Sequence, residues 1–152
     1  MKCILIPLDG SALAEAIIPT ALDLARDLDA RLVLVSVVVP TPTSWGGAAA
    51  GWGPVGTWDV AMLPVDEQTR TTESYLASVK AQMPIAADRV TLDARVGTLP
   101  RGILDAAEKH GADLVAMSTH GRGGLGRLVM GSVTDMVIRL AGIPVLVVRP
   151  PI

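Results

Sequence analysis

Short apolar runs alternate along this chain with longer segments of helical periodicity, and no other feature constrains the fold as strongly. The runs are rich in valine, isoleucine and leucine and span residues 3–7, 31–39, 89–96, 112–117 and 143–148. Most of them are apolar on both faces, which is typical of parallel strands covered by helices on both sides. Strands that alternate with helices favour right-handed crossover connections. The sequence therefore predicts an α/β fold with an open, doubly wound parallel sheet of five strands.

Four helical segments are predicted between these strands. They span residues 11–28, 66–83, 100–110 and 132–141. Pro19 is expected to bend the first helix, and Asp66 is a candidate N-cap of the second. Gly111 is expected to end the third. The fourth opens with a capping-box-like sequence at Ser132–Asp135. With no second pattern of this kind, we expect one domain over residues 1–152.

Composition excludes several classes of protein. The chain of 152 residues carries 13 basic and 15 acidic side chains. Half of its residues are hydrophobic, which excludes a disordered chain. The absence of any basic block argues against binding to nucleic acid or to a membrane surface. Cys3 is the only cysteine, so neither an internal disulfide nor a cysteine zinc site can form. Asp9 interrupts the first apolar run too early for an export signal, and a cytoplasmic location is predicted.

Residues 40–64 form a segment rich in glycine and proline that holds Trp45, Trp52 and Trp58. An insertion of this size within a small domain is usually functional or disordered. Two interpretations stay open. The segment is either a surface loop held to the body by its tryptophan rings, or a lid or partner-binding patch above the carboxyl ends of the strands.

The segment that follows the fourth predicted strand is the most informative for chemistry. It contains five glycines between positions 121 and 131, together with the cations Arg122 and Arg127. Glycines allow backbone amides to face an anion, and Gly131 and Ser132 open a helix whose first amides favour phosphate. The pattern indicates a phosphate cradle. A glycine-rich turn that only caps its helix is the alternative.

Other known motifs are absent. Residues 121–126 match G-x-G-x-x-G by letter, but they follow the fourth strand, and no acidic residue lies about 20 positions later to hold a ribose. A P-loop lysine, a G-x-S-x-G turn and a His/Cys metal cluster are all missing. Asp9 is placed to reach a ligand or a phosphate-bound Mg²⁺, or else to cap the first helix. His120 either contacts phosphate or bonds to backbone.

Five segments together resemble the universal stress protein family. They read ILIPLDGS at 4–11, LVLVSV at 32–37, VGTLPRGIL at 96–104, ADLVAMSTHGRGGLGRLVMGSV at 112–133 and IPVLVVR at 143–149. The resemblance implies a Rossmann-like sheet, similar to that of the adenine nucleotide alpha hydrolases, with strand order 3-2-1-4-5. It also implies a homodimer through residues 143–148.

The family contains members that bind ATP and members that do not. ATP binders carry a glycine, two residues, a second glycine, nine residues, and then glycine with Ser or Thr. Gly121, Gly131 and Ser132 match the second half of this pattern, whereas Ser118 stands in place of the first glycine. The resemblance thus implies an ATP site, although the motif does not distinguish ATP from ADP or AMP.

The resemblance also assigns roles position by position. It implies that Pro7, Leu8 and Asp9 lie along the ribose, that Val37 offers its backbone to adenine, and that Met117 and Ser118 line the floor. Gly121 and Arg122 would wrap the phosphates, and Gly131, Ser132, Val133 and Thr134 would donate from the helix start. Arg127 is added because of its charge.

Three functions follow as hypotheses. The first is an ATP-binding universal stress protein that acts as a stress-response sensor or adaptor. The second is a dimeric interaction protein of the same fold with no nucleotide. The third is a slow ATPase, for which no general base is evident beside the glycine turn.

Overall fold

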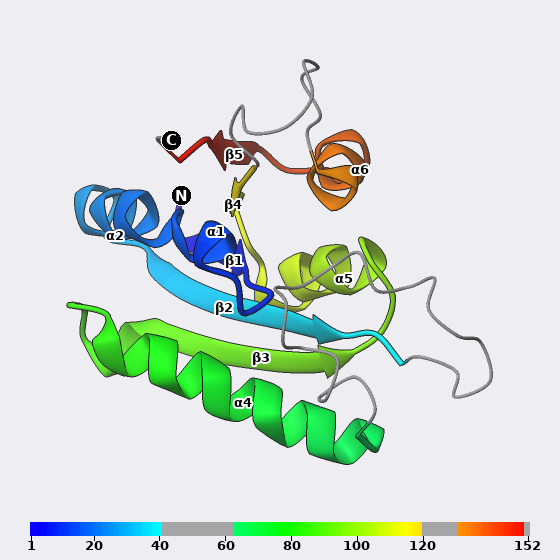
Figure 1. Cartoon of the computed structure of the whole chain (residues 1–152). Coiled ribbons are helices and arrows are strands. Elements are labelled where there is room, and N and C mark those ends of the chain that lie inside the picture. The colour runs from blue at the N-terminus through cyan, green and yellow to red at the C-terminus, as the bar shows by residue number, and fades with distance from the viewer. Residues whose placement is uncertain (41–62, 120–130, 151–152) are drawn as a thin grey trace.

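The computed structural model describes residues 1–40, 63–119 and 131–150, and these contain a five-stranded sheet in the order β3-β2-β1-β4-β5 (Figure 1). Its strands are β1 (Cys3–Pro7), β2 (Arg31–Val38), β3 (Val90–Val96), β4 (Leu114–Ser118) and β5 (Val145–Val148). Every neighbouring pair is parallel. The predicted α/β fold and the strand order implied by the family resemblance are both confirmed.

Helices cover both faces of this sheet. They are α1 (Ala12–Glu15), α2 (Ile18–Asp27), α4 (Val65–Gln82), α5 (Arg101–His110) and α6 (Ser132–Leu140), with a short 3₁₀ turn, η1, at Ala87–Arg89. Figure 1 shows α4 lying along β3 and β2 on one face and α5 crossing the other. Gly111 ends α5 in the left-handed conformation at φ 59°, as its position predicts.

Three predictions about the helices are wrong. Residues 11–28, which were expected to form one bent helix, form two helices, α1 and α2. Pro19 lies in the first turn of α2, where its missing N–H breaks no hydrogen bond of the helix. Asp66 does not cap α4, because the helix begins one residue earlier, after Pro64, and Asp66 falls in its first turn. Ser132 does not form a capping box, because Gly131 is the N-cap of α6 and no side chain caps it.

The core forms two apolar layers, one on each face of the sheet. Alternate residues of a strand point to opposite faces. Ile4 and Ile6 of β1 accordingly pack with α1, α2 and α4, while Cys3 and Leu5 pack with α5 and α6.

β4 and β5 begin two residues later than predicted, and β5, at the sheet edge, is only half-buried.

One further prediction concerns a part of the chain that the structure does not describe. Residues 41–62, with Trp45, Trp52 and Trp58, lie outside the described residues, so the role of this segment stays a prediction. Of the helices within the described ranges, none has the length and apolar character needed to cross a bilayer.

Candidate functional site

The carboxyl ends of β1, β2 and β4 meet at one edge of the sheet. The connection after β1 leads to β2 on one side, whereas β4 pairs with β1 on the other, so the strand order reverses beside β1. Ligands of open α/β sheets bind outside the carboxyl ends of the strands at such a reversal. Pro7 pairs with Val35 and Leu5 with Val115, so Val37 and Ser118 both extend to this edge.

The turn after β1 is fixed by hydrogen bonds around Asp9. Its Oδ1 accepts from the amide of Ser11 at 2.9 Å and from Ser11 Oγ at 2.6 Å. Ser11 Oγ in turn accepts from Ala14 N at 3.0 Å and caps α1. Gly10 allows this turn because its φ of +85° is strained for other residues. Asp9 therefore supports the cap of the first helix, and its Oδ2 has no hydrogen bond within the described ranges.

Val37 of β2 has backbone groups at this edge that no described residue pairs. Backbone groups of a parallel strand point alternately to its two neighbours. Leu8 N donates to Val35 O at 2.8 Å on the β1 side, and Gly97 N donates to Val38 O at 3.0 Å on the β3 side. Val37 therefore points toward β1, which has already ended at Pro7. No hydrogen bond joins Val37 to the turn that follows β1, so one N–H and one C=O have no partner among the described residues.

A small apolar hollow lies against the same residues. Its lining is Pro7, Leu8, Val35, Val37, Leu99 and Ile103, and its volume of about 10 Å³ is room for one water molecule. Pro7, Leu8 and Val37 are thus brought together, and their contacts with a nucleotide stay a prediction. Sequence reasoning missed Leu99 and Ile103, although one signal was present: α5 connects β3 to β4 and so must cross β2 and β1.

Two hydroxyl groups at the end of β4 are buried without a partner. Ser118 Oγ and Thr119 Oγ1 make no hydrogen bond within the described part of the chain. Thr119 is only 5% exposed, and its amide donates to Val148 O at 2.9 Å. Buried hydroxyls are nearly always satisfied, so two together mark a place where a polar ligand fits. Thr119 was not predicted as a site residue, although it stands beside Ser118 in the sequence.

The start of α6 offers further donors. Helices leave their first amides without intrahelical partners, and no side chain caps this one. α6 follows β4 and returns the chain to β5, so it starts near the carboxyl edge. Gly131 is half-buried and Ser132 exposed, while Val133 and Thr134 are buried. These amides and the positive end of the helix dipole suit an anion.

The remaining predicted site residues divide into two groups. Met117 is 4% exposed and packs in the core layer beneath α5 and α6. His120, Gly121, Arg122 and Arg127 lie outside the described residues, so their roles stay predictions. In the described ranges there is no cluster of three potential metal-ligating side chains, and Asp9 is the carboxylate in the turn after β1.

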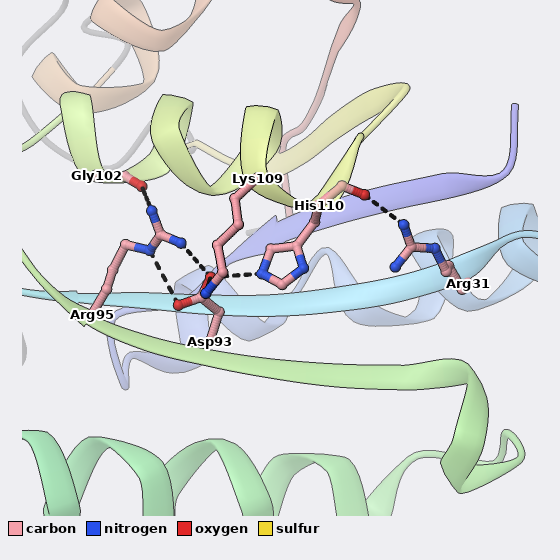
Figure 2. A network of polar contacts seen from close by, with 6 residues as sticks. All are labelled: Arg31, Asp93, Arg95, Gly102, Lys109 and His110. Atoms are coloured by element: carbon pink, nitrogen blue, oxygen red, sulfur yellow. Dashed lines mark hydrogen bonds and ion pairs between the residues drawn. The ribbon is translucent and has the colours of Figure 1, made fainter.

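A network of polar contacts fastens α5 to β3 (Figure 2). Asp93, buried on β3, accepts from Arg95 Nε at 3.1 Å and from His110 Nε2 at 2.7 Å. Arg95 also donates to Gly102 O at 3.5 Å, and Lys109 Nζ lies 3.6 Å from Asp93. Burial raises the pKa of Asp93, but the hydrogen bonds from Arg95 and His110 outweigh it, so the pKa lies below its ordinary value. Neither the first nor the last turn of α5 can move freely from the sheet.

A larger hollow of about 300 Å³ lies between α2 and α4. Tyr75 donates to Glu15 Oε1 at 2.8 Å at its margin, and burial followed by this hydrogen bond raises the pKa of Tyr75. None of the residues at the ends of β1, β2 and β4 lines this hollow, and neither do the unpartnered hydroxyls of Ser118 and Thr119. The smaller hollow is therefore the better candidate site.

A family profile and a related protein both point to the same family. The sequence profile of the universal stress protein family matches residues 1–149. A universal stress protein of Methanocaldococcus jannaschii, MJ0531, is 31% identical over 150 residues, which cover 99% of this chain and 83% of that protein. The chain belongs to the universal stress protein family.

Solved structures show the same fold. The universal stress protein UspA from Lactobacillus plantarum has a TM-score of 0.72 at 21% identity and covers 97% of both chains. A universal stress protein in complex with cAMP has a TM-score of 0.61 at 18% identity, covering 97% of this chain and 96% of the other. The Archaeoglobus fulgidus protein in complex with dAMP has a TM-score of 0.55 at 18% identity, covering 97% and 96%.

Proposed function

We propose that this universal stress protein binds an adenine nucleotide, ATP in the first place, at the carboxyl edge of β1, β2 and β4. The observation that carries the proposal is the backbone of Val37, which no described residue pairs and which lies past the end of β1 beside the hollow of Pro7 and Leu8. A flat apolar surface with one donor and one acceptor at its margin is what a purine base requires.

The open groups of Val37 favour adenine over guanine. A backbone N–H donates and a backbone C=O accepts. Adenine presents an acceptor, N1, beside a donor, the 6-amino group, and so complements both groups of one residue. Guanine presents the reverse order, a 6-oxo acceptor beside an N1 donor, and would set donor against donor. ATP should therefore bind more tightly than GTP, because an unpaired buried polar group is costly.

The phosphates would lie toward α6. The open amides at its start, with the unpartnered Ser118 and Thr119 hydroxyls, supply donors that a phosphate needs. Gly121, Arg122, His120 and Arg127 are proposed to add contacts, on the strength of the motif and of charge. Asp9 could reach a Mg²⁺ ion carried by the phosphates through its free oxygen. That two structurally similar family members are bound to cAMP and dAMP supports an adenine ligand.

The role we propose is that of a stress-response sensor or adaptor rather than a dedicated enzyme. Asp9 is engaged with Ser11, and no other described side chain at this edge is placed as a general base, so any ATP hydrolysis should be slow. A homodimer through residues 143–148 and a cytoplasmic location stay predictions. One observation favours the second candidate, an interaction protein without nucleotide: Ser118 replaces the first glycine of the ATP pattern.

Titration calorimetry tests the proposal. Protein stripped of nucleotide is titrated with Mg-ATP and with Mg-GTP, and saturable binding that prefers ATP is expected. Gly131→Val should abolish binding, because its side chain fills the space that a phosphate needs at the start of α6. Gly142→Val, at the opposite end of the same helix, is the matched control, since a Cβ there meets nothing within 4 Å. Absence of ATP binding, or equal loss in both variants, would refute the site.

A further inference from the structure

Gly102, in the first turn of α5, lies so close to Val37 that no side chain fits between the two residues. A Cβ built on Gly102 lies 2.8 Å and 2.9 Å from the two γ-methyl groups of Val37. Contacts below 3.0 Å force something to move. Gly102 has a helical backbone without positive φ, so its small size serves this close approach rather than a turn.

α5 cannot easily yield to such a contact. Arg95 donates to the carbonyl of Gly102 itself, and Asp93 holds both Arg95 and His110, at the opposite end of the helix (Figure 2). Gly102 N also donates to Thr98 O at 2.7 Å. A larger residue at position 102 would therefore displace Val37 rather than the helix.

We propose that Gly102 is a positioning residue that sets the position of the Val37 backbone and thereby the preference of the site for adenine over guanine. The inference rests on the proposed function. Ser36 and Val38 pair with β3, but Val37 has no hydrogen bond to β1 at this point, so on that side its backbone is held through its side chain packed against α5. Leu99 and Ile103, from the same turn of the chain, complete the wall of the hollow.

The test compares Gly102→Ala with a matched control. Gly97→Ala also adds a methyl group beside Val37, but at 3.9 Å from both Val37 Cγ1 and Gly102 Cα, an ordinary contact. Binding of ATP, GTP and tripolyphosphate is measured by calorimetry. In Gly102→Ala, ATP binding should weaken about tenfold and the ATP-over-GTP preference should shrink, because overpacking shifts the base-reading residue. Tripolyphosphate, which has no base, and every ligand of Gly97→Ala should bind as in the parent.

A rescue variant separates positioning from general damage. In the double variant Gly102→Ala with Val37→Ala, the added Cβ lies 3.5 Å from the Cβ of residue 37, which is normal packing. ATP affinity and the preference over GTP should return. Val37→Ala alone should lower both, because residue 37 then loses its contact with α5, and this variant carries the test if Gly102→Ala does not fold.

The outcomes are distinct. If the parent protein does not bind ATP, the proposed function fails and this inference falls with it. If the parent binds ATP but Gly102→Ala binds it equally well, only this inference is overturned. It is also overturned if ATP and tripolyphosphate weaken together, or if the double variant does not recover.

Discussion

The two ends of the sheet differ in how their polar groups are used. At the amino end, Asp113 Oδ2 accepts from the amides of Lys2 and Cys3 at 2.6 Å and 3.0 Å. Arg89 donates to the carbonyls of Ala25 and Ala30 at 3.2 Å and 2.7 Å. At the carboxyl end, the hydroxyls of Ser118 and Thr119 have no partner among the described residues, and the backbone of Val37 is open.

This difference distinguishes polar groups that stabilise the fold from polar groups that are available to a ligand. Polar groups that pair within the chain stabilise it, whereas groups kept unpaired reduce stability and are retained where a ligand can pair them. The network around Asp93 belongs to the first class, although through α5 it also supports the second. Substitutions at the two kinds of position should therefore have opposite signs, and three experiments test this.

Asp93→Asn should have the largest effect. The carboxylate is 6% exposed and neutralises Arg95, which is 18% exposed, so its loss leaves a largely buried cation without a counterion. We expect a loss of about 3 kcal/mol in the free energy of unfolding, measured by urea denaturation at pH 7.

Asp105→Asn is the control for this change. Asp105 pairs with Arg101 on the exposed side of α5, with side chains 43% and 72% exposed. Such surface pairs contribute about 0–1 kcal/mol. Equal destabilisation by the two substitutions would show that the buried network does not stabilise the contact between α5 and β3.

The same network should make the protein sensitive to acid. The pKa of Asp93 is lower in the folded protein than in the unfolded chain, because the hydrogen bonds from Arg95 and His110 overcome the opposing effect of burial. A group with a lowered pKa stabilises the fold above its unfolded pKa of about 3.9, and this contribution disappears as the pH falls through the folded pKa.

The stability difference between the parent and Asp93→Asn should therefore be full at pH 6 and narrow progressively below about pH 4. Urea midpoints of both proteins at a series of pH values measure it. A difference that stays constant down to pH 2.5, or that grows on acidification, would contradict the assigned role of the carboxylate.

The sequence predicted the layers of this fold better than its details. Apolar runs placed all five strands, because a buried parallel strand needs such runs on both faces. Asp66 and Ser132 were misjudged as caps because each helix begins earlier than such a cap would allow, α4 at Val65 and α6 at Ser132 itself. The pair Asp93–His110 could not be predicted, since only the return of α5 across the sheet brings these residues together.

The candidate site likewise contains residues that the sequence predicted and residues that it did not. The turn after β1 and the start of α6 could be identified from glycines and from the family motif. Leu99, Gly102 and Ile103 were missed, because they precede or begin a helix that reaches the site through its path from β3 to β4, and the implied strand order was the one signal of that path. Thr119 was missed because burial of a hydroxyl without a partner is a property of the folded chain alone.

Thr119→Val is the third experiment, and its effect should be smaller and of opposite sign to that of Asp93→Asn. Valine has the shape of threonine without the hydroxyl, which is buried and unpartnered within the described residues. Removing an unsatisfied group should raise the free energy of unfolding by about 1 kcal/mol, measured by urea denaturation. Binding of ATP, measured by calorimetry, should weaken in the same variant because a phosphate loses a donor. Thr119→Ser, which keeps the hydroxyl, should retain binding. A variant that is less stable than the parent, with ATP affinity unchanged, would place Thr119 with the paired groups of the amino end and remove it from the site.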